Sequence, residues 1–260
     1  LKPSYGSVSR YGLLDLSMSL DQIGTLTKSS EDAKLIFDII KGQDNFDPTT
    51  QNYESKKDNK KQITIGLVDV KKFCDKEIAQ LIHEKTRQIA KQNNWKIKEI
   101  NLPLDIAIQT YYILVYVEFF SATRKFDGRR FGFKIEEQAG PEVMRRILGG
   151  SEISKAEYHG KYYRNALKAK NYVKQQFEKL FSDVDAIILP TTPKLPHKIG
   201  ESISVKEMYS YDVFTTPVNL AEICAISIPA GEIDQKPVGL QILCPKFSEE
   251  SLFNVAKRFE

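Results

Sequence analysis

The spacing of apolar residues along the chain predicts a succession of strands and helices. A β-branched run at residues 63–68 has the composition of a buried strand. Ile78, Ile82 and Ile89 follow at helical spacing and predict an amphipathic helix. Residues 95–100 then alternate between apolar and polar side chains, which predicts a second strand. A strand, a helix and a strand in this order indicate a parallel α/β unit.

The remaining elements are predicted from turn and capping residues as well as from apolar spacing. Ser30 is expected to cap a helix that continues to residue 40, because acidic residues fill its first turn and Gly42 follows its end. Residues 43–61 are polar and predict a surface connection. Further strands are predicted at 185–189, 225–229 and 238–243, and further helices at 104–122, from Pro141 to Gly149 and Gly150, at 160–181 and from Ser248. The chain therefore reads as one α/β domain.

The composition fits a soluble globular chain. Of the 260 residues, 41% are hydrophobic and 28% are charged, which excludes a disordered tail. The longest apolar run, at residues 111–117, ends at Glu118 and is shorter than the roughly 18 residues of a membrane-spanning helix, so we expect no membrane span. The chain begins at Leu1 with neither a methionine nor a secretory signal, and we expect Leu1 to be a cut edge of a longer protein.

Charge and cysteine content argue against two further classes of function. The 38 basic and 34 acidic residues give a net charge of +4, and the lysines are scattered, which indicates a solvated surface rather than a nucleic-acid-binding face. Cys74, Cys224 and Cys244 form no CxxC pairing, and the histidines lie far from them in the sequence. We therefore predict no metal site and no disulfide framework, which suits a reducing cytoplasm.

The familiar catalytic motifs are absent from the sequence. It contains no GxxxxGKS or GxxxxGKT phosphate loop, no GxGxxG turn, no HExxH and no GxSxG elbow. No serine lies beside a histidine or a lysine in a recognisable activating arrangement. The residues alone therefore assign no catalytic residue and no cofactor to this chain.

A few polar residues lie where burial is expected, and each has an ordinary structural interpretation. Tyr111 and Tyr112 belong to the most apolar predicted helix and fit core aromatic residues. Arg145 and Arg146 each lie about 130° from the centre of the apolar face of their helix, so periodicity leaves open which of them points inward. Asp212 fits a surface or capping aspartate. Without further information the sequence predicts only a cytoplasmic α/β domain.

Four segments have a more specific pattern than any single short motif. They are residues 1–12 (LKPSYGSVSRYG), 19–24 (SLDQIG), 126–132 (FDGRRFG) and 215–221 (TTPVNLA). Together they resemble the amidase-signature family, and within it the A subunits of tRNA-dependent amidotransferases. The resemblance implies an α/β amidase-signature fold, with a mixed β-sheet covered by helices on both faces. It spans residues 1–260 and identifies them as the C-terminal portion of a single amidase domain.

The resemblance also implies that the catalytic residues lie outside this chain. In the family, a catalytic lysine, a bridging serine and the serine nucleophile all precede the LKPxYG segment, which here begins at Leu1. By resemblance the N-terminal half of the domain is missing from this chain. We expect that half to be a partner of the chain, because it carries the catalytic residues. We therefore expect the isolated chain to be inactive and assign no catalytic serine to it.

By the same resemblance, the complete protein releases ammonia from glutamine. The ammonia reaches the B subunit of the amidotransferase, which uses ATP and Mg to activate the carboxylate of Glu-tRNA(Gln) or Asp-tRNA(Asn), and the C subunit is a further expected partner. The resemblance implies a cytoplasmic complex and no cofactor in this chain itself.

Three residues of the chain match substrate-binding positions of the family. Arg146 matches the position that binds the α-carboxylate of glutamine, and Asp212 matches the position that binds its α-ammonium group. Each charge of the substrate needs a partner of opposite sign, because an unpaired charge in a pocket is costly. Tyr111 matches the substrate-contacting tyrosine, with the adjacent Tyr112 as the alternative. The resemblance thus selects Arg146 over Arg145.

Two other functions are compatible with the same segments. One is an amidase-family hydrolase of other small amides, and the other is a catalytically silent interaction fragment that keeps the fold and the partner-binding face. The pair Arg146 and Asp212 argues against the first, because a hydrolase of apolar amides has no use for two opposite charges. The second holds if no N-terminal partner exists.

Overall fold

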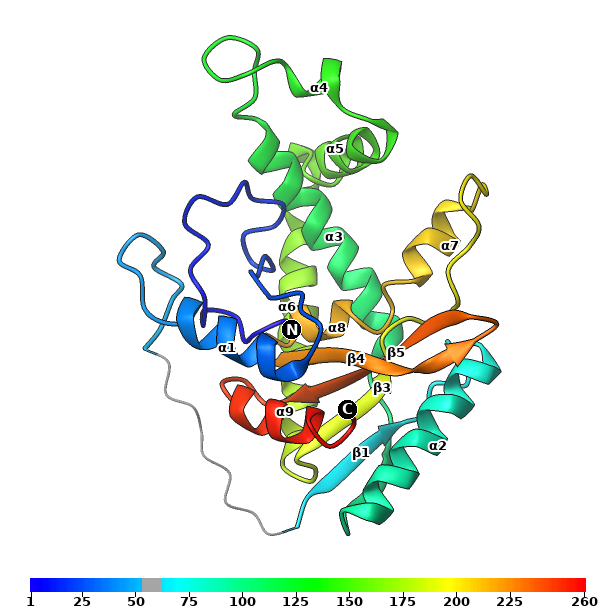
Figure 1. The fold of residues 1–260 in the computed structure, drawn as a ribbon. Coiled ribbons are helices and arrows are strands. Elements are labelled where there is room, and N and C mark those ends of the chain that lie inside the picture. Colours follow the sequence, from blue (N-terminus) through cyan, green and yellow to red (C-terminus); the bar gives the residue numbers. More distant parts are fainter. Residues whose placement is uncertain (53–61) are drawn as a thin grey trace.

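A five-stranded mixed sheet forms the core of the structure (Figure 1). The computed structural model describes residues 1–52 and 62–260, so the second half of the predicted connection at 43–61 lies outside the described residues. In the order β2-β1-β3-β5-β4, the strands are β1 (Thr64–Val68), β2 (Lys96–Ile100), β3 (Ala186–Pro190), β4 (Cys224–Ile233) and β5 (Lys236–Cys244). β2, β1 and β3 are parallel, whereas β5 is antiparallel to both β3 and β4. The predicted mixed sheet is confirmed.

The two C-terminal strands are longer than predicted, because they form a hairpin. Asp234 and Gln235 connect them with φ values of +50° and +61°. Two successive residues with positive φ are typical of a type I′ turn, whose twist matches that of the paired strands. Pairing therefore continues up to the turn, beyond the predicted ends at 229 and 238, although a bulge interrupts the register beside Gly231.

Helices cover both faces of the sheet, as predicted. They are α1 (Ser30–Ile40), α2 (Lys76–Gln92), α3 (Leu104–Thr123), α4 (Ile135–Gln138), α5 (Pro141–Ile153), α6 (Lys161–Phe181), α7 (Val205–Ser210), α8 (Thr216–Leu220) and α9 (Glu249–Ala256). The central strand β3 packs against both layers. Its residues Ala186 and Ile188 share a core with α1, α2 and α9, whereas Ile187 and Leu189 share a core with α3, α6 and α8.

By length and composition alone, α3 could span a membrane. It has 20 residues, and its most apolar 18-residue window has a mean hydropathy of 1.2, with a third of that window buried. Burial is thus less complete than the sequence predicted, because the end of α3 near α5 extends beyond the sheet (Figure 1). Leu114 and Val115 are nevertheless fully buried in the core. Glu118 accepts hydrogen bonds from the hydroxyls of Ser17, at 2.7 Å, and Tyr163, at 3.0 Å. Burial of residues such as Leu114 and Val115 in the core thus accounts for apolar positions on α3, and Glu118 finds polar partners inside the fold.

The helix α5 crosses α3 at very short range, and two glycines allow this approach. A Cβ atom at Gly150 would lie 2.0 Å from the carbonyl oxygen of Tyr116 and 2.6 Å from Cβ of Phe120. A Cβ atom at Gly149 would lie 2.5 Å from the ring of Tyr116. The prediction that these glycines end the helix is wrong, since α5 continues to Ile153. Here glycine removes a side chain from a helix contact instead of terminating the helix.

The start of α1 also differs from the prediction. Ser29, not Ser30, is the N-cap residue, and its hydroxyl accepts a hydrogen bond from the backbone N–H of Asp32 at 3.1 Å. Ser30 is the first helical residue, and its hydroxyl and N–H both donate to the carboxylate of Glu260 at 2.7 Å. The second serine thus ties the helix start to the last residue of the chain.

Glu222 is the centre of a partly buried ionic cluster that joins distant segments. Its side chain is 16% exposed and accepts hydrogen bonds from Lys174 and Lys246 at 3.0 Å, with Lys170 at 3.5 Å. Burial alone raises the pKa of Glu222, but the hydrogen bonds and charges of the lysines outweigh it and lower the pKa to about 2. The backbone oxygen of Glu222 also accepts from the N–H of Tyr5. The cluster therefore holds α6 and the segment after β5 against the first residues of the chain.

We predict that Gly150→Ala destabilises the protein through the α3–α5 crossing. The added methyl group must displace the Tyr116 carbonyl, and overpacking of this kind costs about 1–3 kcal/mol, or roughly 5 °C in Tm for a chain of this size. Thermal unfolding followed by circular dichroism measures the change. Gly140→Ala is the matched control, because Gly140 has φ of −70° and an added Cβ atom there meets nothing within 4 Å. Equal Tm values for both variants would contradict the packing argument.

We predict that Glu222→Gln lowers stability in a pH-dependent way. The folded-state pKa of about 2 lies below the ordinary value of 4.5, so the contribution of Glu222 is complete above pH 4.5 and is lost as the pH falls towards 2. Denaturant unfolding should give a free-energy difference between wild type and variant of roughly 2 kcal/mol at pH 7 that shrinks between pH 4.5 and 2. Glu250→Gln is the control, because Glu250 pairs with Lys34 at the surface. A difference that does not depend on pH would refute the assignment.

Candidate functional site

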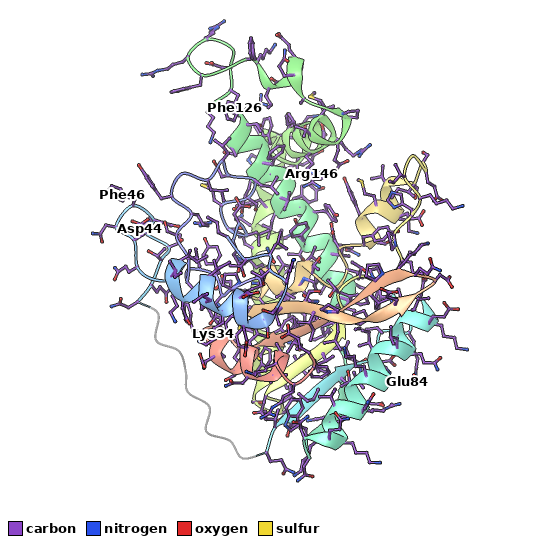
Figure 2. All side chains as sticks on the ribbon, viewed as in Figure 1. Lys34, Asp44, Phe46, Glu84, Phe126 and Arg146 are labelled. Carbon is purple, nitrogen blue, oxygen red and sulfur yellow. The ribbon has the colours of Figure 1, made fainter. Side chains whose placement is uncertain are left out.

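The structure brings together the three residues that the sequence analysis selected as substrate contacts. Tyr111 lies on α3, Arg146 lies on α5, and Asp212 lies two residues after the end of α7. Figure 2 labels Arg146 on α5 beside the upper part of α3. Burial raises the pKa of the Tyr111 hydroxyl, and the nearby charges of Asp212, which raises it, and Arg146, which lowers it, also act on this group. A cation, an anion and a neutral phenol therefore meet in one place.

Asp212 is held by the second tyrosine of the pair. The Tyr112 hydroxyl donates a hydrogen bond to Oδ2 of Asp212 at 2.6 Å, and burial together with this carboxylate raises the pKa of Tyr112. The Tyr111 ring packs edge-on against the Tyr112 ring, with centroids 5.2 Å apart. Among the described residues, none forms a hydrogen bond with the Tyr111 hydroxyl. This arrangement favours Tyr111 as the ligand contact and Tyr112 as the residue that orients Asp212.

Arg146 and Arg145, which periodicity could not separate, differ in their surroundings. The Arg146 side chain is 20% exposed and that of Arg145 is 40% exposed. Nε of Arg146 donates to Oε1 of Glu142 at 3.1 Å, while Arg145 pairs with the other carboxylate oxygen. Burial lowers the pKa of Arg146, but Glu142 more than offsets this, so the group stays charged. Within residues 1–52 and 62–260, no side chain pairs with its Nη atoms, which leaves them for a carboxylate ligand.

Sequence reasoning missed the residues that support this pair of charges. The contact of Glu142 with Arg146 could have been predicted from the sequence, because Glu142 lies four residues before Arg146 and such spacing places two side chains on one face of a helix. Tyr112 was considered only as an alternative to Tyr111. Tyr209 had no signal beyond its position three residues before Asp212, yet its ring stacks on that of Tyr112 with centroids 3.9 Å apart.

The arrangement can bind and orient a ligand, and it offers no visible nucleophile. In the part of the chain that the structure describes, no serine hydroxyl is hydrogen-bonded to a lysine or histidine side chain. The same part contains no group of three histidine, cysteine, aspartate or glutamate residues that could hold a metal ion. A ligand with adjacent carboxylate and ammonium groups would complement the free guanidinium edge of Arg146 and the carboxylate of Asp212. This is the chemistry of an α-amino acid.

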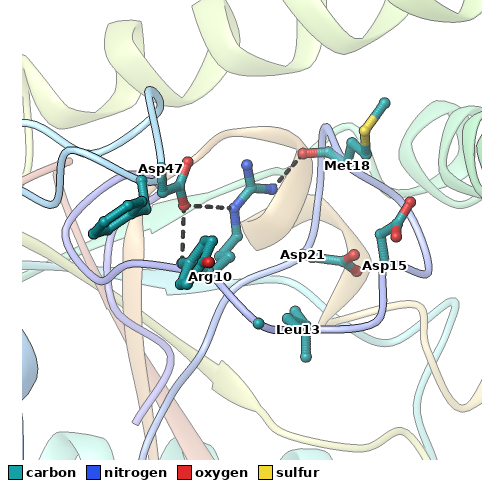
Figure 3. Close-up of a pocket in the computed structure, with 9 residues that line it drawn as sticks. Arg10, Leu13, Asp15, Met18, Asp21 and Asp47 are labelled. Carbon is teal, nitrogen blue, oxygen red and sulfur yellow. Dashed lines mark hydrogen bonds and ion pairs between the residues drawn. The ribbon is translucent and has the colours of Figure 1, made fainter.

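A separate pocket of about 270 Å³ lies among the first 50 residues (Figure 3). The guanidinium of Arg10 in this pocket is already paired, because its Nε lies 3.4 Å from Oδ2 of Asp47, and the same oxygen accepts from the backbone N–H of Arg10. Burial alone raises the pKa of Asp47, but hydrogen bonds from Thr49 and Arg10 lower it to about 2. Asp21, also in the lining, is close enough for its charge to act on Tyr111. The lining residues are Arg10, Tyr11, Gly12, Leu13, Asp15, Met18, Asp21, Phe46 and Asp47.

Comparison with known proteins gives matches along the whole chain. The family model described as Amidase matches residues 1–253. The chain is 50% identical to the A subunit of the glutamyl-tRNA(Gln) amidotransferase of Methanocaldococcus jannaschii, in an alignment that covers 100% of this chain and 60% of that protein. The crystal structure of the A subunit of the glutamyl-tRNA(Gln) amidotransferase from Thermotoga maritima has a TM-score of 0.81 and 31% identity, with 100% of this chain and 56% of that chain covered.

A more distant structure has the same fold. A bacterial aryl acylamidase of the amidase signature enzymes has a TM-score of 0.81 at 18% identity, with 100% of this chain and 57% of that chain covered. The predicted fold class is therefore confirmed, and the matches agree with the resemblance of residues 1–12 and the other motif segments. The chain spans about 60% of the length of the curated relatives that it matches.

Proposed function

The chain belongs to the amidase family, and from this premise we propose that it supplies the glutamine-binding part of a tRNA-dependent amidotransferase. The observation that carries the proposal is the placement of Arg146 and Asp212 near Tyr111, whose hydroxyl has no hydrogen-bond partner among the described residues. Arg146 binds the α-carboxylate of glutamine with its Nη atoms, and Asp212 binds the α-ammonium group. Tyr111 donates a hydrogen bond from its hydroxyl to the bound substrate. The side-chain amide of glutamine is thereby directed away from the clamp.

The hydrolysis itself needs an activated nucleophile, and the residues that the structure describes show none. A serine hydroxyl, supplied by the portion of the domain that precedes this chain in the relatives, attacks the amide carbonyl of glutamine. The C–N bond breaks as the ester bond to serine forms, and the serine proton passes to the nitrogen, which leaves as ammonia. Water then hydrolyses this ester to release glutamate and restore the serine. In this scheme the chain contributes substrate binding and orientation, which lower the barrier by holding the amide next to the nucleophile.

The ammonia has a defined destination in the proposed complex. The B subunit, with ATP and Mg, activates the carboxylate of a tRNA-linked amino acid, and the C subunit joins the assembly in the cytoplasm. The name of the relative with 50% identity favours Glu-tRNA(Gln) over Asp-tRNA(Asn) as the acceptor. A hydrolase of apolar amides is disfavoured, since such a substrate offers no charge to the Nη atoms of Arg146 or to the carboxylate of Asp212.

We predict that Arg146→Ala severely impairs glutamine use, whereas Arg145→Ala has little effect. Removing the cation proposed to bind the α-carboxylate of glutamine should lower kcat/KM for ammonia release by about a hundredfold, while loss of the more exposed Arg145 should change it less than about threefold. The assay follows ammonia released from glutamine by the reconstituted enzyme. Equal losses in the two variants would show that the wrong arginine has been assigned.

We also predict that the isolated 260-residue chain releases no ammonia from glutamine. The physical reason is that no activated nucleophile is found among the described residues, and a bound and oriented amide still hydrolyses slowly without one. A coupled glutamate assay on the purified chain measures this, with the full-length A protein of a tRNA-dependent amidotransferase as the positive control. Substantial glutaminase activity that co-purifies with the chain would overturn the division of labour proposed above.

A further inference from the structure

Tyr209 on α7 contacts both halves of the charged site. Its hydroxyl donates a hydrogen bond to Oε1 of Glu142 at 3.1 Å, and this same oxygen accepts the hydrogen bond from Nε of Arg146. Its ring stacks on the Tyr112 ring at an interplanar angle of 21°, and the Tyr112 hydroxyl donates to Asp212. One side chain therefore touches the residue that holds the cation and the residue that holds the anion.

The hydroxyl of Tyr209 is fixed as a donor towards Glu142. Burial, with a contribution from its hydrogen bond to Tyr116, raises the pKa of Tyr209, so the phenol stays protonated at neutral pH. Its oxygen also lies 2.6 Å from the Tyr116 hydroxyl. Because the Tyr209 proton is directed to Glu142, Tyr116 is the donor in this second hydrogen bond. Tyr116 is the residue that packs on Gly149 and Gly150, so the α3–α5 crossing sets the position of Tyr209.

Tyr209 and Asp212 also belong to the same turn of the chain. The N–H of Asp212 donates to the backbone oxygen of Tyr209 at 3.2 Å, in the turn that ends α7. The short helix α7 projects from the loop that follows β3 (Figure 1). At its start, Ser204 caps the helix by accepting from the N–H of Glu207. The contacts of Tyr209 with Tyr112 and Glu142 thus dock the end of α7, and with it Asp212, against α3 and α5.

We propose that Tyr209 is a positioning residue that couples recognition of the two charged ends of the substrate. This inference rests on the proposed function and adds a route between its two binding residues. The route runs from Arg146 through Glu142 to the Tyr209 hydroxyl, and from the Tyr209 ring through Tyr112 to Asp212. A change at the hydroxyl disturbs the carboxylate end alone, whereas loss of the ring disturbs both ends.

Two substitutions separate these links in the reconstituted enzyme. Tyr209→Phe keeps the stack and removes the hydrogen bonds to Glu142 and Tyr116, so KM for glutamine should rise about fivefold with kcat changed less than about twofold. Tyr209→Leu removes both links and should raise KM about twentyfold. Tyr211→Phe is the matched control, because Tyr211 lies on the same segment and its hydroxyl donates only to the backbone oxygen of Leu195 among the described residues. Its KM and kcat should equal those of wild type.

Product analogues that lack one charged group report on each end separately. Glutarate has no α-ammonium group, and 4-aminobutyrate has no α-carboxylate. Tyr209→Phe should raise the inhibition constant of glutarate about fivefold and leave that of 4-aminobutyrate unchanged, whereas Tyr209→Leu should raise both. A purely structural role for Tyr209 would lower Tm and the active fraction but leave KM and both inhibition constants unchanged.

The outcomes distinguish this inference from the proposed function. If Arg146→Ala abolishes glutamine use while both Tyr209 variants keep the wild-type KM, the coupling is refuted and the function stands. If Arg146→Ala has no effect either, the proposed function itself fails. Should Tyr209→Leu not fold, Tyr209→Phe decides alone, because its ring still fills the same space. Equal effects of Tyr209→Phe on the two analogues would refute the one-sided role of the hydroxyl.

Discussion

The close crossing of α3 and α5 is the constraint on which the candidate site depends. Gly150 lies against the carbonyl oxygen of Tyr116, at a separation that excludes any side chain. Arg146 lies one turn before Gly150 and therefore shares the helix face that is directed towards α3. Tyr112 lies one turn before Tyr116 on the facing helix. Two backbone positions in contact thus fix where the cation of the site stands relative to the tyrosines that hold its anion.

The sequence predicted the elements of the fold better than their ends and contacts. Residues 63–68 and 185–189 were recognised as strands because buried strands carry a local excess of β-branched and aliphatic residues. Gly149 and Gly150 were interpreted as a helix end, although they permit a helix crossing. Glycine has both roles because each follows from the missing Cβ atom, and only the tertiary neighbour decides between them. Ser29 and Ser30 pose the same problem, since either hydroxyl could cap α1 until the position of Glu260 is known.

The residues of the candidate site were likewise predictable only where neighbours in the sequence determine them. Arg145 and Arg146 are equivalent by periodicity, and family resemblance was needed to prefer Arg146. Both arginines pair with Glu142 in the structure, and Arg146 is the less exposed of the two. Tyr112 was visible only as a rival of Tyr111. Tyr209 was missed because its partners lie on helices that are more than 60 residues away in the sequence. A stack between two distant tyrosines leaves no pattern in a single sequence.

The two charges of the candidate site are kept apart. In the described part of the chain, Arg146 and Asp212 form no ion pair with each other. Glu142 occupies one edge of the guanidinium, and Tyr112 occupies one oxygen of the aspartate. A direct ion pair between them would close the site, because a ligand would have to break it before binding. The stacked rings of Tyr112 and Tyr209 instead belong to the chain of contacts that links the two charges. A zwitterionic ligand that bridges Arg146 and Asp212 would form one ion pair with each and would leave the net charge of the site unchanged.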